Sequence, residues 1–167
     1  AFCFYRADND ASPRYRKTLA EVVAICRGLA ASGVVLLDLT MGEDPLLHDE
    51  PGQATLVDLV ASVSAATATP VMVSPGVLQE DTLRSLRAAG ADWYALYQET
   101  HTPELYATLR VGQSFAARAE ARAAARRAGM LVEDGLLTGI GDTPADRARS
   151  IVAMREAGEE QVRVMTF

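Results

Sequence analysis

Short apolar runs alternate with longer segments of helical periodicity along the whole chain. The apolar runs are rich in β-branched and aromatic residues, which is typical of strands buried on both faces. They cover residues 34–39, 71–73, 93–97, 130–132 together with 135–137, and 162–165. The segments between them predict helices over 18–31, 52–67, 79–89, 103–110, 114–128 and 144–156. Thr18 with Glu21 forms a capping box, and Pro144 suits a first helical turn.

The alternation of strand and helix predicts right-handed crossovers and a parallel sheet. Glycines at positions 33, 90, 129 and 158 are placed to end helices with a left-handed residue. No GxGxxG fingerprint follows the first strand, and polar residues follow several strands in turn, as at a barrel mouth. We therefore expect the α/β class and a (β/α) TIM-type barrel. Five strands cannot close an eight-stranded barrel, so we expect residues 1–167 to form one partial domain, truncated at both ends.

The composition and net charge of the chain indicate which classes of protein it can belong to. The 167 residues are 49% hydrophobic and carry a formal net charge of -6, which fits a globular chain and argues against nucleic-acid or anionic-membrane binding. No apolar run approaches the roughly 20 residues that span a bilayer, so we expect a cytoplasmic protein. Two cysteines cannot complete a four-ligand metal site. Cys26 lies on an apolar helix face and is expected in the core, whereas composition does not decide the role of Cys3.

Candidate binding residues stand at the ends of the predicted strands. Asp38 interrupts an apolar strand and Glu99 follows an aromatic one, so each needs a partner if buried. Arg110, Arg118 and Arg163 could fix a ligand carboxylate. In contrast, the arginines at 122, 126 and 127 are expected to face solvent, and the loop carboxylates at 44, 49 and 50 are expected to be solvated.

Two further features are weaker signals. His48 and His101 could titrate near neutral pH, but neither has a spaced companion for a metal. Gly139 and Gly141 would let the backbone approach a flat ligand or a phosphate closely. We name no catalytic side chain.

Several motifs together resemble the radical S-adenosylmethionine (SAM) superfamily. Cys3, followed by Phe4-Tyr-Arg-Ala-Asp-Asn9, resembles the end of the Cys-x3-Cys-x2-Cys loop whose thiolates hold a 4Fe-4S cluster. The segment 40–43 is similar to the Gly-Gly-Glu element that docks the amino group of SAM, and 135–142 is similar to the adenine-contacting turn. By this resemblance the other two cluster cysteines should precede Ala1. The chain is then an internal fragment that is inactive alone.

More narrowly, segments 37–45, 73–77, 93–101, 109–114 and 161–165 resemble the lysine mutases of pyrrolysine biosynthesis, within the biotin-synthase-like group. This resemblance implies that a 5′-deoxyadenosyl radical converts L-lysine to (3R)-3-methyl-D-ornithine. It also implies an electron donor such as a ferredoxin or flavodoxin. Asp142 stands where the superfamily usually has a glutamate.

The resemblance also implies a set of site residues. Cys3 would be a cluster ligand. The residues implied to hold SAM are Phe2, Gly42, Glu43, Glu99, Arg110 and Arg118, and those implied to face the amino acid are Asp38, Ser74 and Arg163.

Three alternatives remain open from sequence. The first is another radical SAM enzyme of the biotin synthase or hydrogenase-maturase group. The second is a metal-free aldolase-like barrel that binds phosphate at 139–142. Its Schiff base would need a lysine at a strand end, and Lys17 lies elsewhere. The third is a binding module without an iron cluster.

Overall fold

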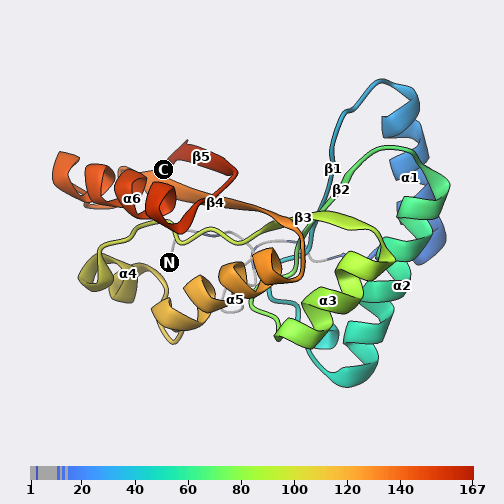
Figure 1. The fold of residues 1–167 in the computed structure, drawn as a ribbon, viewed down its shortest axis with the longest axis horizontal. Coiled ribbons are helices and arrows are strands. Elements are labelled where there is room, and N and C mark those ends of the chain that lie inside the picture. Colours follow the sequence, from blue (N-terminus) through green and yellow to red (C-terminus); the bar gives the residue numbers. More distant parts are fainter. Residues whose placement is uncertain (1–2, 4–10, 12, 14) are drawn as a thin grey trace.

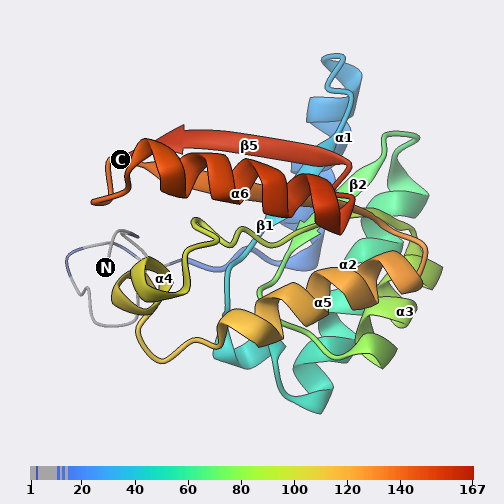
Figure 2. The ribbon, with the colours of Figure 1, turned by 60° about the vertical axis from the view of Figure 1, so that its left-hand side comes forward.

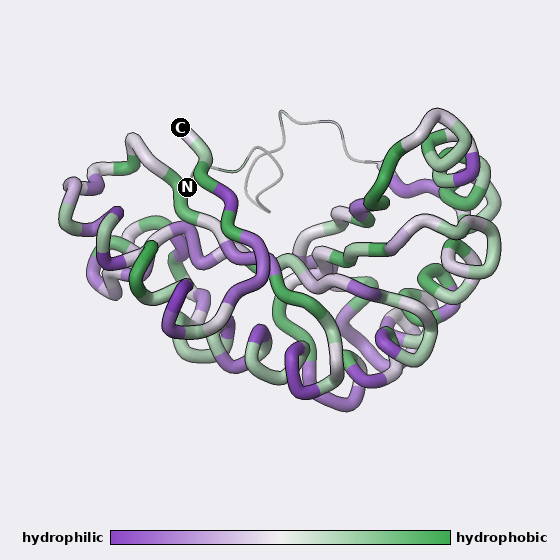
Figure 3. The backbone as a smooth tube through the Cα atoms, turned by 45° about the horizontal axis from the view of Figure 1, so that its top comes forward, coloured by the Kyte–Doolittle hydropathy of each residue, from purple (hydrophilic) through white to green (hydrophobic). Residues whose placement is uncertain are grey.

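The computed structural model describes residues 3, 11, 13 and 15–167. Within them, five parallel strands form one sheet in the sequential order β1-β2-β3-β4-β5. The sheet curls into an arc that is open on one side (Figure 3), which confirms the predicted partial TIM-type barrel. The strands are β1 Leu37–Thr40, β2 Val71–Ser74, β3 Ala91–Ala95, β4 Leu131–Thr138 and β5 Gln161–Thr166.

Helices connect successive strands and cover the outer side of the arc (Figures 1 and 2). Thr18 and Glu21 make the predicted capping box, and Gly90 and Gly158 end their helices in the left-handed region. The predicted helices are confirmed, with ends that differ by one or two residues. They are α1 Leu19–Ala31, α2 Glu50–Ala66, α3 Glu80–Ala89, α4 Pro103–Leu109, α5 Phe115–Arg127 and α6 Pro144–Ala157, with a short 3-10 helix, η1, at Pro45–Leu47.

The largest difference from the sequence prediction lies in β4. Two apolar runs were expected there, but one continuous strand spans Leu131–Thr138 and includes Glu133 and Asp134. Both carboxylates are fully buried. They interrupt the apolar pattern without interrupting the strand, because each meets charged partners on its own face of the sheet.

The hydrophobic core lies between the sheet and the helices. Leu83, Leu86, Val60 and Tyr94 are completely buried there. Cys26 joins the same cluster with 3% of its surface exposed, which confirms it as a core residue.

The core membership also fixes which side chains face the opposite, concave side of the arc. Leu37, Leu39, Val71 and Val73 belong to the core between sheet and helices. Successive side chains of a strand point to opposite faces, so the alternate residues point to the concave side. By the same alternation and by strand register, this inner face carries Asp38, Ser74, Glu133, Gly135 and Arg163.

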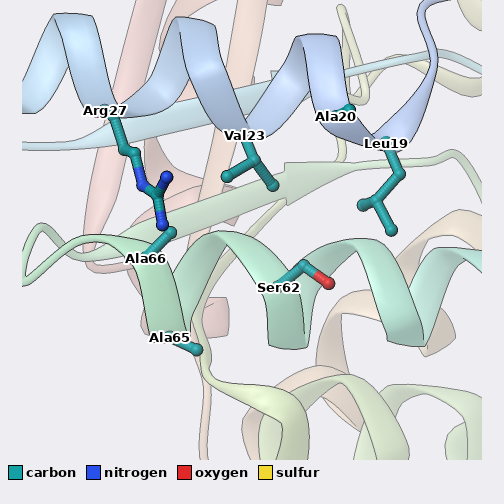
Figure 4. Close-up of a pocket in the computed structure, with 7 residues that line it drawn as sticks. All are labelled: Leu19, Ala20, Val23, Arg27, Ser62, Ala65 and Ala66. Carbon is teal, nitrogen blue, oxygen red and sulfur yellow. The ribbon is translucent and has the colours of Figure 1, made fainter.

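A shallow groove runs along the outside, between α1 and α2. Leu19, Val23 and Arg27 of α1 lie opposite Ser62 and Ala66 of α2 (Figure 4). Its lining holds no cluster of titratable or nucleophilic groups, so the polar site lies elsewhere. Among the described residues, no helix is long and apolar enough to cross a membrane.

A leucine pair tests the position of the core. Leu83 is completely buried and Leu46 is 60% exposed. We expect Leu83→Ala to lower the free energy of unfolding by about 2–5 kcal/mol, because it removes buried methyl groups and leaves a cavity. Leu46→Ala should stay within about 0.5 kcal/mol. Urea denaturation of both variants checks this, and similar losses would contradict the assigned core.

Candidate functional site

A loop after β1 places Glu43 at the mouth of the arc. Gly42 has φ 64° and donates its N–H to the carbonyl of Ser74 at 3.1 Å. Gly76 has φ 86°, and a Cβ atom there would overlap the side chain of Glu43. Glycine is therefore needed at position 76 to let the side chain of Glu43 lie against the segment after β2.

Glu43 joins residues that are far apart in sequence. Its Oε1 lies 2.9 Å from Nη1 of Arg118, and its Oε2 accepts a hydrogen bond from Nε2 of Gln113 at 2.8 Å. Oε1 of Gln113 in turn accepts a hydrogen bond from Nη1 of Arg110 at 2.9 Å. Nη2 of Arg110 contacts Oε1 of Glu99 at 2.8 Å. A continuous polar chain thus links Glu43, Arg118, Gln113, Arg110 and Glu99, which we call the mouth cluster.

Glu99 is the most constrained member of the mouth cluster. It has φ 69°, the one positive φ among the non-glycine residues described. Its residue surface is 5% exposed. Burial raises the pKa of its carboxyl, and the charge of Arg110 opposes that shift. Its Oε2 is buried and accepts no hydrogen bond from the described residues, which leaves an acceptor for a ligand.

Arg118 anchors the mouth cluster to the sheet. It projects from the first turn of α5, and its Nε and Nη2 donate to the carbonyl of Tyr97 at 3.2 and 2.8 Å. Only 6% of its side chain is exposed. Burial lowers the pKa of this guanidinium, and the charge of Arg110 acts in the same direction. Glu43 supplies the compensating negative charge.

A second network supports the site from the helix side of the sheet. Asp134 is completely buried, and its Oδ1 accepts hydrogen bonds from the N–H groups of Gln98 and Gly135, both at 2.6 Å. Its Oδ2 lies 3.1 Å from Nη2 of Arg122 and 3.2 Å from Nε2 of His101. These contacts hold the backbone immediately before Glu99.

Arg122 corrects a sequence expectation. It was expected to face solvent, but it is 3% exposed and pairs with Asp134 and Glu159. The small alanine side chains of α5 leave room for Arg122 to reach the sheet. The Ala-rich composition of the helix gave no sign of this contact. Arg126 and Arg127 remain partly exposed, as expected.

Each histidine has one ring nitrogen in contact with a protein acceptor. His101 pairs with buried Asp134, and Nε2 of His48 lies 2.9 Å from the carbonyl oxygen of Pro75.

The backbone N–H groups of the Gly-rich turn after β4 already have an acceptor within the protein. Oδ1 of Asp142 accepts the N–H groups of Gly139 and Ile140 at 2.7 and 3.0 Å. A phosphate there would have to compete with this carboxylate, which disfavours the aldolase-like alternative.

The inner face holds the residues implied to bind an amino acid. Asp38 and Ser74 lie on the register-paired strands β1 and β2, and Arg163 lies on β5 beside Gly135 of β4. The three therefore share one face of the sheet. Cys3 is exposed, and Phe2 lies outside the described residues.

Several residues of the site were not identified individually from sequence. Gln113 bridges two charged members of the mouth cluster, and Gly76 gives Glu43 room. Glu133, Asp134 and Tyr97 are buried or half-buried polar groups within or beside apolar runs. The available signal in the sequence was the pair of charged residues, Glu133 and Asp134, inside an apolar strand. Such buried charges require partners of opposite charge.

Comparison with known proteins places the chain in a family. Residues 1–152 match the model of the radical SAM superfamily. The chain belongs to the radical SAM superfamily. It is 43% identical over all 167 residues to a protein named 3-methylornithine synthase from Methanosarcina acetivorans, and covers 47% of that protein. The chain thus spans about half the length of the curated relatives it matches.

Solved structures show the same likeness. A crystal structure of methylornithine synthase (PylB) matches with a TM-score of 0.94 and 43% identity, over 99% of this chain and 48% of that one. The FeFe-hydrogenase maturase HydG from Carboxydothermus hydrogenoformans matches with a TM-score of 0.81 and 23% identity, over 95% of this chain and 39% of that one. This second match shows the shared fold alone.

Two glycines test the loop that carries Glu43 in this radical SAM protein. Gly76 and Gly33 have nearly the same φ, 86° and 89°, but a Cβ at Gly33 would meet open space. We expect Gly33→Ala to cost about 1–2 kcal/mol of unfolding free energy from left-handed strain alone. Gly76→Ala should cost more, because it also displaces Glu43. The additional cost of Gly76→Ala over Gly33→Ala should vanish when Glu43 is also replaced by alanine. Chemical denaturation of Gly33→Ala, Gly76→Ala, Glu43→Ala and the Gly76→Ala/Glu43→Ala double variant measures these costs. A persistent excess would contradict the assigned contact.

A second prediction concerns the network behind the mouth cluster. Asp134→Asn leaves Arg122 and His101 facing a neutral group in a buried position. We expect a loss of about 3–5 kcal/mol in unfolding free energy, as for other broken buried pairs. Glu120→Gln removes an exposed partner of Arg127 on α5 and should cost about 0–1 kcal/mol. Urea denaturation measures both losses. Equal losses of unfolding free energy in the two variants would show that the charge of Asp134 does not stabilise the fold.

Proposed function

We propose that this protein is a radical SAM mutase that converts L-lysine to (3R)-3-methyl-D-ornithine in pyrrolysine biosynthesis. The observation that carries this proposal is the 43% identity to 3-methylornithine synthase over the whole chain. We further propose that residues 1–167 form part of a single barrel domain.

The mouth cluster fits the binding of SAM. The buried Oε2 of Glu99 lacks a donor among the described residues, and SAM carries an ammonium group and ribose hydroxyls that can donate to it. Arg118 and Arg110 are fixed by Glu43 and Gln113, so the positive charge that a SAM carboxylate needs is already in place. We propose that Gly42, Glu43, Glu99, Arg110 and Arg118, with Phe2, hold SAM.

Cys3 would supply one thiolate to a 4Fe-4S cluster. Cys3 is an exposed residue, and thiolates are the ligands of such clusters. No group of three or more His, Cys, Asp and Glu side chains in the described ranges is placed to hold a metal, so other ligands are required. When bound, the cluster and SAM supply a 5′-deoxyadenosyl radical that can abstract hydrogen from an unactivated carbon.

The inner face fits an amino-acid substrate. A carboxylate such as Asp38 attracts an ammonium group, and the guanidinium of Arg163 attracts a carboxylate. Ser74 adds a neutral hydroxyl on the strand between them. Because all three lie on strands, a bound amino acid would be held rigidly on the side away from the helices.

Two further parts of the proposal follow from the cluster chemistry. Reduction of the cluster requires an electron donor, and a ferredoxin or a flavodoxin would serve. Thiolate ligands must also stay reduced, which is the normal condition of thiols in the cytoplasm. We therefore propose a cytoplasmic protein.

The test uses the complete protein, reconstituted anaerobically with iron and sulfide. With L-lysine, SAM and a reductant, we expect 5′-deoxyadenosine and methylornithine, both detected by mass spectrometry. Release of 5′-deoxyadenosine with another substrate, and no methylornithine from lysine, would assign the protein to another activity of the superfamily. A reconstituted protein without an absorption band near 400 nm would contradict the cluster itself.

A matched arginine pair on α5 tests the SAM site. Each arginine contacts two acceptors, but Arg118 is buried beside Glu43, whereas Arg127 is exposed. A lysine keeps the charge but loses the planar fork of donors, so we expect Arg118→Lys to weaken SAM binding about tenfold or more. Arg127→Lys should leave it unchanged. Equilibrium dialysis with labelled SAM measures both, and equal affinities would contradict the role of Arg118.

A further inference from the structure

Glu133 is a buried charge on the inner face that the proposed function leaves without a role. It is completely buried on β4, between β3 and β5. Its Oε1 accepts a hydrogen bond from the hydroxyl of Tyr97 and lies 3.1 Å from Nε of Arg163. Its Oε2 accepts one from Nη2 of Arg163 at 3.3 Å. Both oxygens have a partner within the protein, and the complete burial of Glu133 keeps it from direct contact with a ligand.

These contacts restrict Arg163 in a specific way. Glu133 takes the Nε and Nη2 edge of the guanidinium, and the guanidinium carbon lies 5.7 Å from the centroid of the Tyr97 ring. A guanidinium has five N–H donors, and the described residues offer no acceptor to Nη1. The side chain is still 43% exposed. Its unused edge is thus fixed in direction and accessible.

Tyr97 connects this inner pair to the SAM side. Its hydroxyl donates to Glu133, and its carbonyl accepts the two hydrogen bonds from Arg118. Burial raises the pKa of the Tyr97 phenol, and the hydrogen bond to Glu133 acts in the same direction. The phenol therefore stays protonated and remains a donor.

We propose that Glu133 and Tyr97 are positioning residues that present the free edge of Arg163 to the carboxylate of an amino-acid substrate. This inference rests on the proposed function and adds two residues to it. A long, flexible arginine loses rotamer freedom when it binds a ligand, and prior restraint removes that cost from binding. Bidentate recognition of a carboxylate also requires the planar guanidinium to be correctly oriented.

The opposite role is a physical alternative that can be tested. A carboxylate beside Arg163 could compete with the substrate for the guanidinium and weaken binding. The two roles predict opposite signs: removing the charge of Glu133 weakens substrate binding if it positions Arg163, and strengthens it if it competes.

The experiment compares Glu133→Gln, Tyr97→Phe and the control Glu120→Gln in the complete, cluster-reconstituted protein. KM and kcat are measured with L-lysine, and the Kd of SAM is measured by equilibrium dialysis. We expect Glu133→Gln to raise KM about tenfold and Tyr97→Phe to raise it about threefold. The Kd of SAM and the 400 nm band should change less than about twofold, because the backbone carbonyl of Tyr97 is retained. The control should match the wild type.

Several outcomes would overturn the proposal. KM unchanged or lowered in Glu133→Gln would exclude positioning, and so would a parallel loss of SAM affinity and of the cluster band, which indicates a purely structural role. If Glu133→Gln does not fold, Tyr97→Phe decides, since it removes a single hydroxyl.

Failure of the proposed function is separable from failure of this inference. A wild type that is inactive on L-lysine but releases 5′-deoxyadenosine with another amino acid refutes the lysine assignment. The same KM comparison is then made with that amino acid. A wild type that responds to no carboxylate-bearing compound would overturn both.

Discussion

Two neighbouring carboxylates on β4 must both be neutralised, and the arrangement of the site follows from this. Glu133 and Asp134 are completely buried, and an unpaired buried charge costs several kcal/mol. Because adjacent strand residues point to opposite faces, the two charges need cations on opposite sides of the sheet. Arg122 meets Asp134 on the helix side, and Arg163 meets Glu133 on the inner side. Through these contacts, the dipeptide Glu133–Asp134 holds α5, β5 and the segment after β3 in fixed positions relative to β4.

The backbone at Glu99, in the mouth cluster, depends on Asp134. Asp134 accepts the N–H of Gln98, and the next residue, Glu99, has the unfavourable φ of 69°. A non-glycine residue stays in that region only when its surroundings over-determine it. Here the parallel bridge between Glu99 and Leu136 and the Asp134 contact provide the constraint. The buried carboxylate of Glu99 is thus oriented before any ligand binds, which is the condition for selective recognition of a ligand donor.

The sequence predicted the architecture well because the architecture follows from local patterns. Strand and helix periods, the capping box at Thr18 and the helix-ending glycines are all encoded within a few residues. The mouth cluster is different, since Glu43 and Arg118 are 75 residues apart and no spacing rule connects them. The family resemblance implied a role for those two residues, but it implied none for Gln113, which links Glu43 to Arg110. Arg122 was assigned wrongly because exposure was inferred from composition, whereas the decisive fact was a charge inside β4.

Tyr97 shows how the two halves of the site can act together. Its carbonyl oxygen is held by Arg118 on the side proposed to bind SAM, and its hydroxyl is held by Glu133 on the inner face. In the proposed reaction, hydrogen abstraction by a carbon radical requires the reacting atoms to be in close contact, so the cofactor and the substrate would have to be placed relative to each other within fractions of an ångström. A flexible loop between the two sites would not give that precision. A single residue whose backbone belongs to one site and whose side chain belongs to the other fixes the distance through covalent geometry, and the paired charges on β4 keep that residue in place.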